Sequence, residues 1–409
     1  MKEQIVVSMT SWHKRIGNLP AVLDTIMAQT IQPDAIVINL SVEEFPTREL
    51  PADVQTYIDA YDRIRVNWVR YNTRVWKKFL PTLLLYPDAL ILPIDDDILY
   101  PPTMIEGFMM AHAKYPDRPI SGNHFWYKGM KCHCGCASLV QAKHFEGWQK
   151  YYKHAFRVSC PSSDLFYTYL AAANGYFYAE TDEDYMRSIV SYNEVDGYSA
   201  SFPKNRLRVS REAIFNALGV EVVRLFKDDD HKPFCVLGSM QTDKGKAIEE
   251  EMLAWLAPRF NVYLVRHDGR AFEYTAIAFL KKIMSNQDEP CFYLHTKGAF
   301  YTRKLSHRVR NMWRFEFGGR ADRYLQAVKG DTPKVSCPYT GSEKVTWYNG
   351  WCANAAAIRT MHLIKTDDRF YYEYLLFTDA DVIGLRMNDV NQPKEERLIM
   401  HGDLKACFD

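Results

Sequence analysis

The chain has 409 residues, of which 47% are hydrophobic, and its 51 lysine and arginine residues are balanced by 50 aspartate and glutamate residues. The length allows two domains of ordinary size, and a formal net charge of +1 argues against a protein that binds nucleic acid through its overall charge. No apolar run approaches the roughly 18 residues of a membrane-spanning helix and no signal-peptide pattern precedes IVVSMTS, so we expect a cytoplasmic protein.

Strand and helix patterns alternate along the first hundred residues. Short apolar runs predict strands at 4–11, 34–41, 64–71 and 88–94. Between the first two runs, apolar residues recur with helical spacing from Leu19 to Met27. Near-continuous apolar strands separated by helices predict a Rossmann-like α/β fold, with a mostly parallel sheet that is covered on both faces.

Nine cysteines are scattered through the chain, an odd number that is typical of reduced thiols and not of a disulfide framework. Three of them alternate with other residues in KCHCGCAS, namely Cys132, Cys134 and Cys136. This spacing matches the C-x2-C pairs of zinc sites poorly, and alternating residues share one face of a strand, where cysteine behaves as a small apolar residue. We expect a structural role, with a metal or redox role as the alternative.

The predicted strand at 88–94 runs directly into three consecutive aspartates, Asp95, Asp96 and Asp97. Crowded carboxylates repel one another unless a cation neutralises them, and ligands of open α/β sheets bind outside the carboxyl ends of the strands. Mg²⁺ and Mn²⁺ prefer oxygen ligands of this kind, often completed by substrate phosphates. If the strand alternation continues, Asp95 and Asp97 converge on one metal and Asp96 faces a sugar or ribose hydroxyl. Capping or turn formation by aspartate is the alternative.

A second aspartate triplet, at 228–230, stands in FKDDDHKPF without an apolar strand before it, and this pattern indicates a solvated linker. Strand and helix patterns begin again after it. Strands are predicted at 234–240, 261–267 and 291–298, with helices after the first two. We therefore expect two tandem α/β units, 1–228 and 232–409.

Two longer stretches carry a resemblance to a known family. IVVSMTSWHKRIGNLPAVLDTIMAQTIQPDAIVINLS and VWKKFLPTLLLYPDALILPIDDDILYPP resemble the opening and central segments of bacterial polysaccharide glycosyltransferases with the GT-A fold. The similarity spans roughly residues 4–200. It implies a nucleotide-sugar donor, most often UDP-linked, and a Mn²⁺ or Mg²⁺ ion held by Asp95 and Asp97, with Asp96 at the donor.

The same resemblance implies roles for other residues of the first unit. Thr10, Ser11 and Arg15 follow the first predicted strand, where the base and ribose of the nucleotide would lie. Lys77 and Lys78 precede the aspartate strand, where a lysine can neutralise a diphosphate. A solvated pair of surface lysines is the alternative for Lys77 and Lys78.

Two further segments match the family. Asn123 and His124 lie in PISGNHFW, which resembles the segment that lines the donor sugar and the acceptor, although His124 is equally compatible with a packed histidine. Asp164, in CPSSDLFYTYLAAANG, matches the acidic residue that acts as general base in inverting members, although the family often has two acidic residues where this chain has Ser163 and Asp164. The alternative for Asp164 is an N-cap, and a retaining enzyme would not need this base.

The second unit has no D-x-D motif at the matching strand end, where CFYLHTKGAF stands instead. With NMWRFEF, WYNGWCANAAAIRTM and DDRFYYEYLLF, it resembles a second group of GT-A-like bacterial glycosyltransferase domains, which carry an HTKG motif. This resemblance implies that His295 and Lys297 contact a nucleotide sugar and that Glu373 is a possible base. Basic side chains there suit a diphosphate without a metal, or the phosphates or sugar rings of an acceptor.

These features predict a nucleotide-sugar-dependent hexosyltransferase, with a weak preference for galactose, that extends a lipid-linked bacterial polysaccharide such as O-antigen or capsule. Its acceptor would lie at the inner membrane, which the protein would reach by peripheral association. It would be bifunctional if both units are catalytic. The alternatives are one catalytic unit with an acceptor-binding unit, a non-catalytic carbohydrate-binding protein, and a nucleotidyltransferase. The last usually carries a glycine-rich N-terminal loop, which VVSMTSWHKRIG lacks.

Overall fold

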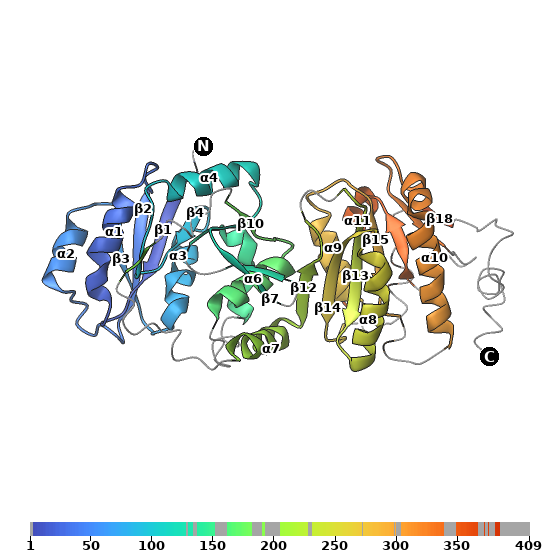
Figure 1. Ribbon diagram of the computed structural model, residues 1–409, viewed down its shortest axis with the longest axis horizontal. Helices are drawn as coiled ribbons and strands as arrows, with labels where there is room; N and C mark the ends of the chain where they lie inside the picture. Colours follow the sequence, from blue (N-terminus) through green and yellow to red (C-terminus); the bar gives the residue numbers. More distant parts are fainter. Residues whose placement is uncertain are drawn as a thin grey trace. The chain divides into compact units, whose positions relative to one another are not determined.

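A computed structural model divides the chain into two compact units, Met1–Leu218 and Gly219–Asp409 (Figure 1). None of the described helices is long and apolar enough to cross a membrane. The structure describes residues 3–127, 130–133, 137–151, 162–181, 190–192, 205–227, 231–271, 273–297, 299, 304–338, 349–366, 372, 375 and 381–384.

The core of the first unit is a four-stranded sheet in the order β3-β2-β1-β4, in which every pair is parallel. Its strands are β1 (Ile5–Thr10), β2 (Ala35–Ser41), β3 (Ile64–Val69) and β4 (Leu90–Pro93). β1, β2 and β4 are buried along almost their whole length, as strands covered on both faces must be. The predicted parallel α/β sheet is confirmed.

Alternation along β1 assigns the two helical layers of the first unit. Val7 and Met9 point into an apolar core that also contains Leu23 and Ile26. On the opposite face, the hydroxyl groups of Ser8 and Thr82 lie 2.6 Å apart. The helices are α1 (Leu19–Met27), α2 (Ala52–Asp59), α3 (Leu80–Leu85), α4 (Met104–Lys114), α6 (Ser163–Ala173) and α7 (Arg206–Leu218), with short 3-10 helices at Ile16–Asn18, Arg74–Lys78 and Ala142–Phe145.

Short strands extend the sheet beyond β4, and they determine which loops reach the aspartates. They are β9 (Ser138–Leu139), β6 (Ile120–Ser121) and β10 (Ala179–Glu180), in the order β10-β6-β9. Antiparallel bridges from Ile91 to Val140 and from Ile94 to Ala137 join β4 to the segment around β9. Because β9 is also antiparallel to β6, β4 and β6 run in the same direction. Their carboxyl ends therefore lie at the same edge of the sheet.

Two small strand pairs complete the described part of the first unit. β7 (His124–Tyr127) and β8 (Met130–His133) form an antiparallel hairpin in which His124 pairs with His133. β5 (Ile98–Leu99) pairs with β11 (Val190–Ser191). Cys132 is buried in β8, as expected for a structural cysteine, whereas Cys134 and Cys136 lie outside the described residues.

Replacing His144 by glutamine should make folding stability less sensitive to acid. Burial lowers the pKa of His144 to about 3, whereas an unfolded chain binds this proton near pH 6.5. Stability therefore falls as the pH drops from 6.5 towards 3, and His144 accounts for about 2 kcal/mol of that loss at pH 5. Glutamine can still accept from the backbone N–H of Gln141, as Nδ1 of His144 does at 3.1 Å. Urea unfolding at pH 7 and pH 5 measures the change, and an equal acid loss in both proteins would contradict it.

The second unit is built on a seven-stranded mixed sheet in the order β12-β14-β13-β15-β17-β16-β18. The predicted strands β13, β14 and β15 form its parallel centre, whereas β12 and β17 join antiparallel. The strands are β12 (Val220–Arg224), β13 (Phe234–Met240), β14 (Asn261–His267), β15 (Cys291–His295), β16 (Lys334–Cys337), β17 (Trp351–Ala353) and β18 (Asp381–Gly384). Because β12 pairs with β14, the second unit begins at Gly219, before the boundary expected at 228–232. Residues 228–230 themselves lie outside the described part.

Two helical layers cover this sheet. The helices are α8 (Asp243–Leu256), α9 (Tyr274–Ile283), α10 (Lys304–Ala327) and α11 (Ala355–Thr360). On β13, Ser239 bonds to Glu249 of α8, whereas its neighbour Gly238 faces α9, where an added Cβ would lie 2.9 Å from Cβ of Ala276. Adjacent strand residues point to opposite faces, so α8 and α9 cover opposite faces of the sheet.

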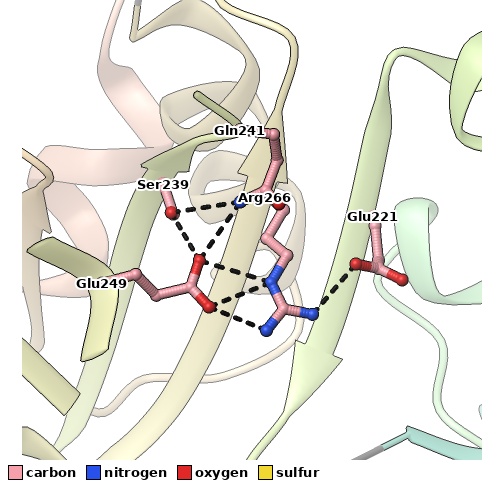
Figure 2. Close-up of polar contacts among 5 residues, drawn as sticks. All are labelled: Glu221, Ser239, Gln241, Glu249 and Arg266. Carbon is pink, nitrogen blue, oxygen red and sulfur yellow. Dashed lines mark hydrogen bonds and ion pairs between the residues drawn. The ribbon is translucent and has the colours of Figure 1, made fainter. Parts of the chain in front are cut away.

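A buried polar network ties β12, β13, β14 and α8 together (Figure 2). The Arg266 guanidinium lies between Glu249, at 2.7 Å, and Glu221, at 3.0 Å. Ser239 and Gln241 donate to Oε2 of Glu249, at 2.5 and 3.2 Å. The two carboxylates offset the positive charge of Arg266, so no charge in this network is buried without a partner.

Candidate active site

The aspartate triplet lies in a turn and does not continue the strand. β4 ends at Pro93, and Asp96 and Asp97 belong to the turn that follows. The strand alternation expected for the triplet is therefore wrong, because the extended backbone on which it depends stops before Asp95. The turn still brings all three carboxylates to the carboxyl edge of the sheet, next to the segment that follows β1.

Asp96 is the buried member of the triplet, with a residue exposure of 2%. Its Oδ2 accepts from the Ser11 hydroxyl at 2.6 Å, and its Oδ1 lies 2.8 Å from the Arg15 guanidinium. Burial raises the pKa of Asp96 to about 6, although Arg15 and Ser11 act in the opposite direction. Both oxygens of Asp96 are thus bound to protein groups, so this residue holds the turn to the segment after β1.

Arg15 also contacts Asp97, whose Oδ2 it reaches at 2.5 Å. Burial and then the neighbouring Asp95 raise the pKa of Asp97. Asp95 forms an ion pair with Lys78 at 2.6 Å. Two cationic side chains, from segments more than 60 residues apart in the sequence, therefore converge on the triplet.

The carboxylates fit a divalent cation held by two protein ligands. In the described part of the chain, no hydrogen bond or ion pair reaches Oδ2 of Asp95 or Oδ1 of Asp97. Both side chains are partly exposed, by 30% and 22%. The described residues contain no group of three or more histidine, cysteine or acidic side chains suited to a metal. Two carboxylates suffice where substrate phosphates complete the coordination.

The two neighbouring lysines have different environments. Lys78 contacts Asp95, as described above. Lys77 is 2% exposed, and its amine contacts Glu44 and, at 2.7 Å, Oδ1 of Asn72. Burial lowers the pKa of Lys77, against the opposing effect of Glu44. Only Lys78 of the predicted pair is therefore brought to the triplet.

Alanine substitutions should separate the two lysines. Lys77→Ala leaves Glu44 without its buried partner and should lower folding stability by about 3 kcal/mol. Lys78→Ala should leave stability nearly unchanged and raise the donor KM at least about tenfold, as expected for one lost charge-assisted hydrogen bond. Urea unfolding and steady-state kinetics on both variants test this pair. A loss of donor affinity confined to Lys77→Ala would reverse the assignment.

Three other predicted residues lie at or near the same edge. Thr10 ends β1, and its hydroxyl donates to the carbonyl of Asn39 at 2.7 Å. Asn123 follows β6, and its carbonyl accepts from the Ser121 hydroxyl. His124 begins β7 and contacts Glu180 at the end of β10. The hydroxyl group of Thr10 therefore makes a contact within the protein, as the hydroxyl group of Ser11 does with Asp96.

Asp164 lies in the first turn of α6, but it is not the N-cap. Ser162 is the N-cap, and its Oγ accepts from the backbone N–H of Leu165 at 3.3 Å. The capping alternative for Asp164 is therefore wrong. The Asp164 carboxylate lies close enough to Tyr178 to raise its pKa, in addition to the larger effect of burial.

His133 is a buried residue beside α6 that was not among the predicted site residues. Its ring stacks on Tyr178 with centroids 5.1 Å apart, and its backbone N–H donates to Thr168 of α6 at 3.2 Å. Burial and then Lys78 lower the pKa of His133 to about 3, against a smaller opposing effect of Asp95. His133 stands in KCHCGCAS, where the cysteines were the more obvious signal. His133 is therefore a neutral imidazole that packs against α6, within electrostatic range of Lys78 and Asp95.

The HTKG motif of the second unit lies at the carboxyl edge of its sheet. His295 ends β15 opposite Gly238, and its Nε2 lies 3.4 Å from Oε1 of Glu273. The carbonyl of Lys297 accepts from Arg310 at 2.8 Å. Glu373 lies outside the described residues. No local pattern in the sequence relates Glu273 to the HTKG motif, because it stands 22 residues before His295.

No family model matches the chain, and no curated protein matches it. Among solved structures, it is similar to a mannosyltransferase from Pyrobaculum calidifontis in complex with GDP-Man and Mn²⁺, with 14% identity, 52% of this chain and 61% of that chain covered, and a TM-score of 0.37. The match thus spans less than two thirds of the mannosyltransferase. TarS residues 1–349 of S. aureus, in complex with UDP-GlcNAc, match with 10% identity, 79% and 89% coverage and a TM-score of 0.37.

A 4-diphosphocytidyl-2C-methyl-D-erythritol synthase from Anaerococcus prevotii also matches, with 11% identity, 53% of this chain and 96% of that chain covered, and a TM-score of 0.30. All three TM-scores are below 0.5. The likenesses therefore carry no conclusion about the chemistry of this chain, which depends on its own residues.

Proposed function

We propose that the first unit is a nucleotide-sugar-dependent glycosyltransferase. One observation carries this proposal: Asp95, Asp97, Arg15 and Lys78 meet at one sheet edge. Asp95 and Asp97 each have one carboxylate oxygen that no described residue contacts. Carboxylates for a divalent cation and cations for phosphate oxygens are together the chemistry that a nucleoside diphosphate requires. Asp95 and Asp97 would hold Mn²⁺ or Mg²⁺, and Lys78 and Arg15 would contact the diphosphate.

The residues of this edge have distinct roles in the proposed reaction. The bound metal would supply Lewis acidity that stabilises the departing diphosphate. Arg15 and Lys78 would donate hydrogen bonds to phosphate oxygens, while Asp96 and Ser11 keep Arg15 in place. Asp164 would accept the proton of the acceptor hydroxyl as the hydroxyl oxygen bonds to the anomeric carbon and the nucleoside diphosphate leaves. Asn123 would contact the donor sugar, and Thr10 and Ser11 would contact the nucleoside through their backbone.

The substrates follow from the family resemblance of the sequence. The donor would be a UDP-linked hexose, with galactose first among the candidates, and the acceptor would be a lipid-linked glycan of O-antigen or capsule type. The protein would act in the cytoplasm and reach this acceptor by peripheral association with the inner membrane. A nucleotidyltransferase is the weaker alternative, because the segment after β1 lacks a glycine-rich loop.

The second unit would be a second transferase, with His295 and Lys297 at the diphosphate of its donor and Glu373 as its base. The basic motif at the sheet edge supports this function, because it occupies the position that carboxylates take in the first unit. The alternative is a non-catalytic unit that binds the growing acceptor.

Turnover of UDP- and GDP-linked hexoses with Mn²⁺ or EDTA, followed by product mass spectrometry, tests these proposals. We expect metal-dependent turnover of one UDP-hexose. In the Lys297→Ala protein, a second transferase would leave a product short of its last sugar, whereas an acceptor-binding unit would leave all products and a raised acceptor KM. Absence of turnover with every donor would contradict the transferase proposal.

A further inference from the structure

We propose that Glu273 is a positioning residue that holds His295 in its protonated form, so that the second unit binds a nucleoside diphosphate without a metal. This inference rests on the proposed function of that unit. It concerns a carboxylate that neither the sequence patterns nor the resemblance assigned. Its support comes from the contacts of Glu273 with His295 at the end of β15 and with Asn349 just before β17.

The Glu273 carboxylate is directed towards the sheet edge and not into its own helix. Glu273 occupies the N-cap position of α9, yet its side chain makes no capping hydrogen bond. Its Oε1 lies 3.4 Å from Nε2 of His295, and its Oε2 accepts from Nδ2 of Asn349. Substitution of Glu273 therefore removes no helix cap, and its effects on His295 can be measured separately from helix stability.

Asn349 fixes the orientation of Glu273. Its side chain is fully buried, and its Oδ1 accepts from Nε1 of Trp351 at 2.8 Å. Asn349 has a φ of 53°, in the left-handed region that few residues other than glycine and asparagine adopt. A continuous chain of contacts thus runs from Trp351 through Asn349 and Glu273 to His295. A buried side chain that is fixed in this way cannot follow a change at His295, which makes it a rigid support.

The surroundings of His295 suit an anion. Oε1 of Glu273 lies 3.4 Å from Nε2 of His295, and a carboxylate beside the ring balances the charge of an imidazolium. His267, at the end of β14 on the far side of β13, adds no charge, because burial lowers its pKa to about 4. Lys297 follows two residues after His295 and supplies a second cation. Unlike the first unit, this edge has no carboxylate triplet among its described residues, which favours direct contact with phosphate oxygens.

Two aromatic residues restrict the movement of the His295 ring. The Tyr293 ring is nearly parallel to it, at 12° with centroids 6.4 Å apart, and the Trp313 ring lies at 5.6 Å. The Tyr293 hydroxyl is buried and has no hydrogen-bond partner among the described residues. Gly238 lies beneath these groups, where an added Cβ would be 3.6 Å from Cβ of His295 and 3.5 Å from the Tyr293 hydroxyl. The imidazole is therefore held by neighbours on both sides of the strand end, with an unused buried hydroxyl close by.

Calorimetric titration of the full chain with UDP in EDTA tests this inference, because EDTA removes the metal from the first unit. We expect the wild-type protein to bind UDP, and we expect Glu273→Gln and His295→Ala each to weaken binding about tenfold or more, as for one lost charge-assisted hydrogen bond. Glutamine keeps the size of Glu273 and an oxygen for Asn349, and it removes only the charge. Glu250→Gln, an exposed position on α8, is the control for charge and should bind as wild type.

Nitrogen NMR of the His295 imidazole gives a readout that a merely structural role would not change. At pH 7 we expect the wild-type ring to be protonated at both nitrogens and the Glu273→Gln ring to be neutral, with equal unfolding temperatures. If wild type binds UDP in EDTA and Glu273→Gln binds equally well, the inference is wrong while a second nucleotide site stands. If wild type does not bind UDP in EDTA, or binds uridine as tightly as UDP, the diphosphate site of the second unit is itself contradicted.

Discussion

Replacing Asp97 by alanine should reduce glycosyl transfer about 10³-fold or more, because a metal that stabilises the departing diphosphate contributes several kcal/mol to the transition state. The same substitution should leave the unfolding temperature unchanged or slightly raised. Burial and Asp95 raise the pKa of Asp97, so the ionised carboxylate is unfavourable at this position. Arg15 keeps its ion pair with Asp96 at 2.8 Å. Steady-state kinetics with saturating Mn²⁺ and thermal unfolding measure the two effects.

The second aspartate triplet supplies a matched control for this prediction. Asp229→Ala makes the same chemical change in the triplet at 228–230, which three residues separate from the end of β12, and it should keep full activity. Full activity of Asp97→Ala, or of the wild-type enzyme in excess EDTA, would remove the basis of the metal assignment.

Replacing Asp164 by asparagine should lower kcat about 10²-fold, the usual contribution of a general base, while donor binding persists. Asparagine keeps the shape of the side chain and loses its basicity. The N-cap of α6 is Ser162, at 3.3 Å from the backbone nitrogen of Leu165, so the helix start is unaffected. The pH profile of kcat and the Kd for UDP in both proteins measure the effect.

Ser162→Ala is the control that separates catalysis from helix capping. It should cost about 1 kcal/mol of stability, as for a typical N-cap, with kcat nearly unchanged. If Asp164→Asn retains wild-type kcat, Asp164 is not the base. The stereochemistry of the product then becomes informative, because a retaining enzyme needs no base at this position.

The strand and helix periods of the sequence were sufficient to predict both sheet cores. The apolar runs at 4–11, 34–41, 64–71 and 88–94 became β1 to β4, and the helical spacing from Leu19 became α1. These predictions succeeded because buried parallel strands and amphipathic helices are encoded by local patterns. Two-residue strands such as β6, β9 and β10 are too short for any period to appear, so the extension of the sheet that brings Asn123 to the edge was not predictable.

The contacts of the site depend on residues that are distant in the sequence. Arg15 and Asp97 are 82 positions apart, and Asn349 and Glu273 are 76 apart, so no local pattern relates them. Lys77 and Lys78 are adjacent in the 3-10 helix Arg74–Lys78, where three residues make a turn, so their side chains point about 120° apart. Glu44, the partly buried partner of Lys77, lies 33 residues away, and the sequence gives no indication of this pairing.

Electron paramagnetic resonance of Mn²⁺ tests the central claim most directly, because it measures metal binding without requiring the acceptor. With UDP present, the wild-type chain should bind Mn²⁺ and diminish the signal of the free ion. Asp95→Ala and Asp97→Ala should each leave that signal undiminished, and Asp229→Ala should behave as wild type. Equal Mn²⁺ binding by wild type, Asp95→Ala and Asp97→Ala, or no UDP-dependent binding by wild type, would contradict a metal–diphosphate site at the end of β4.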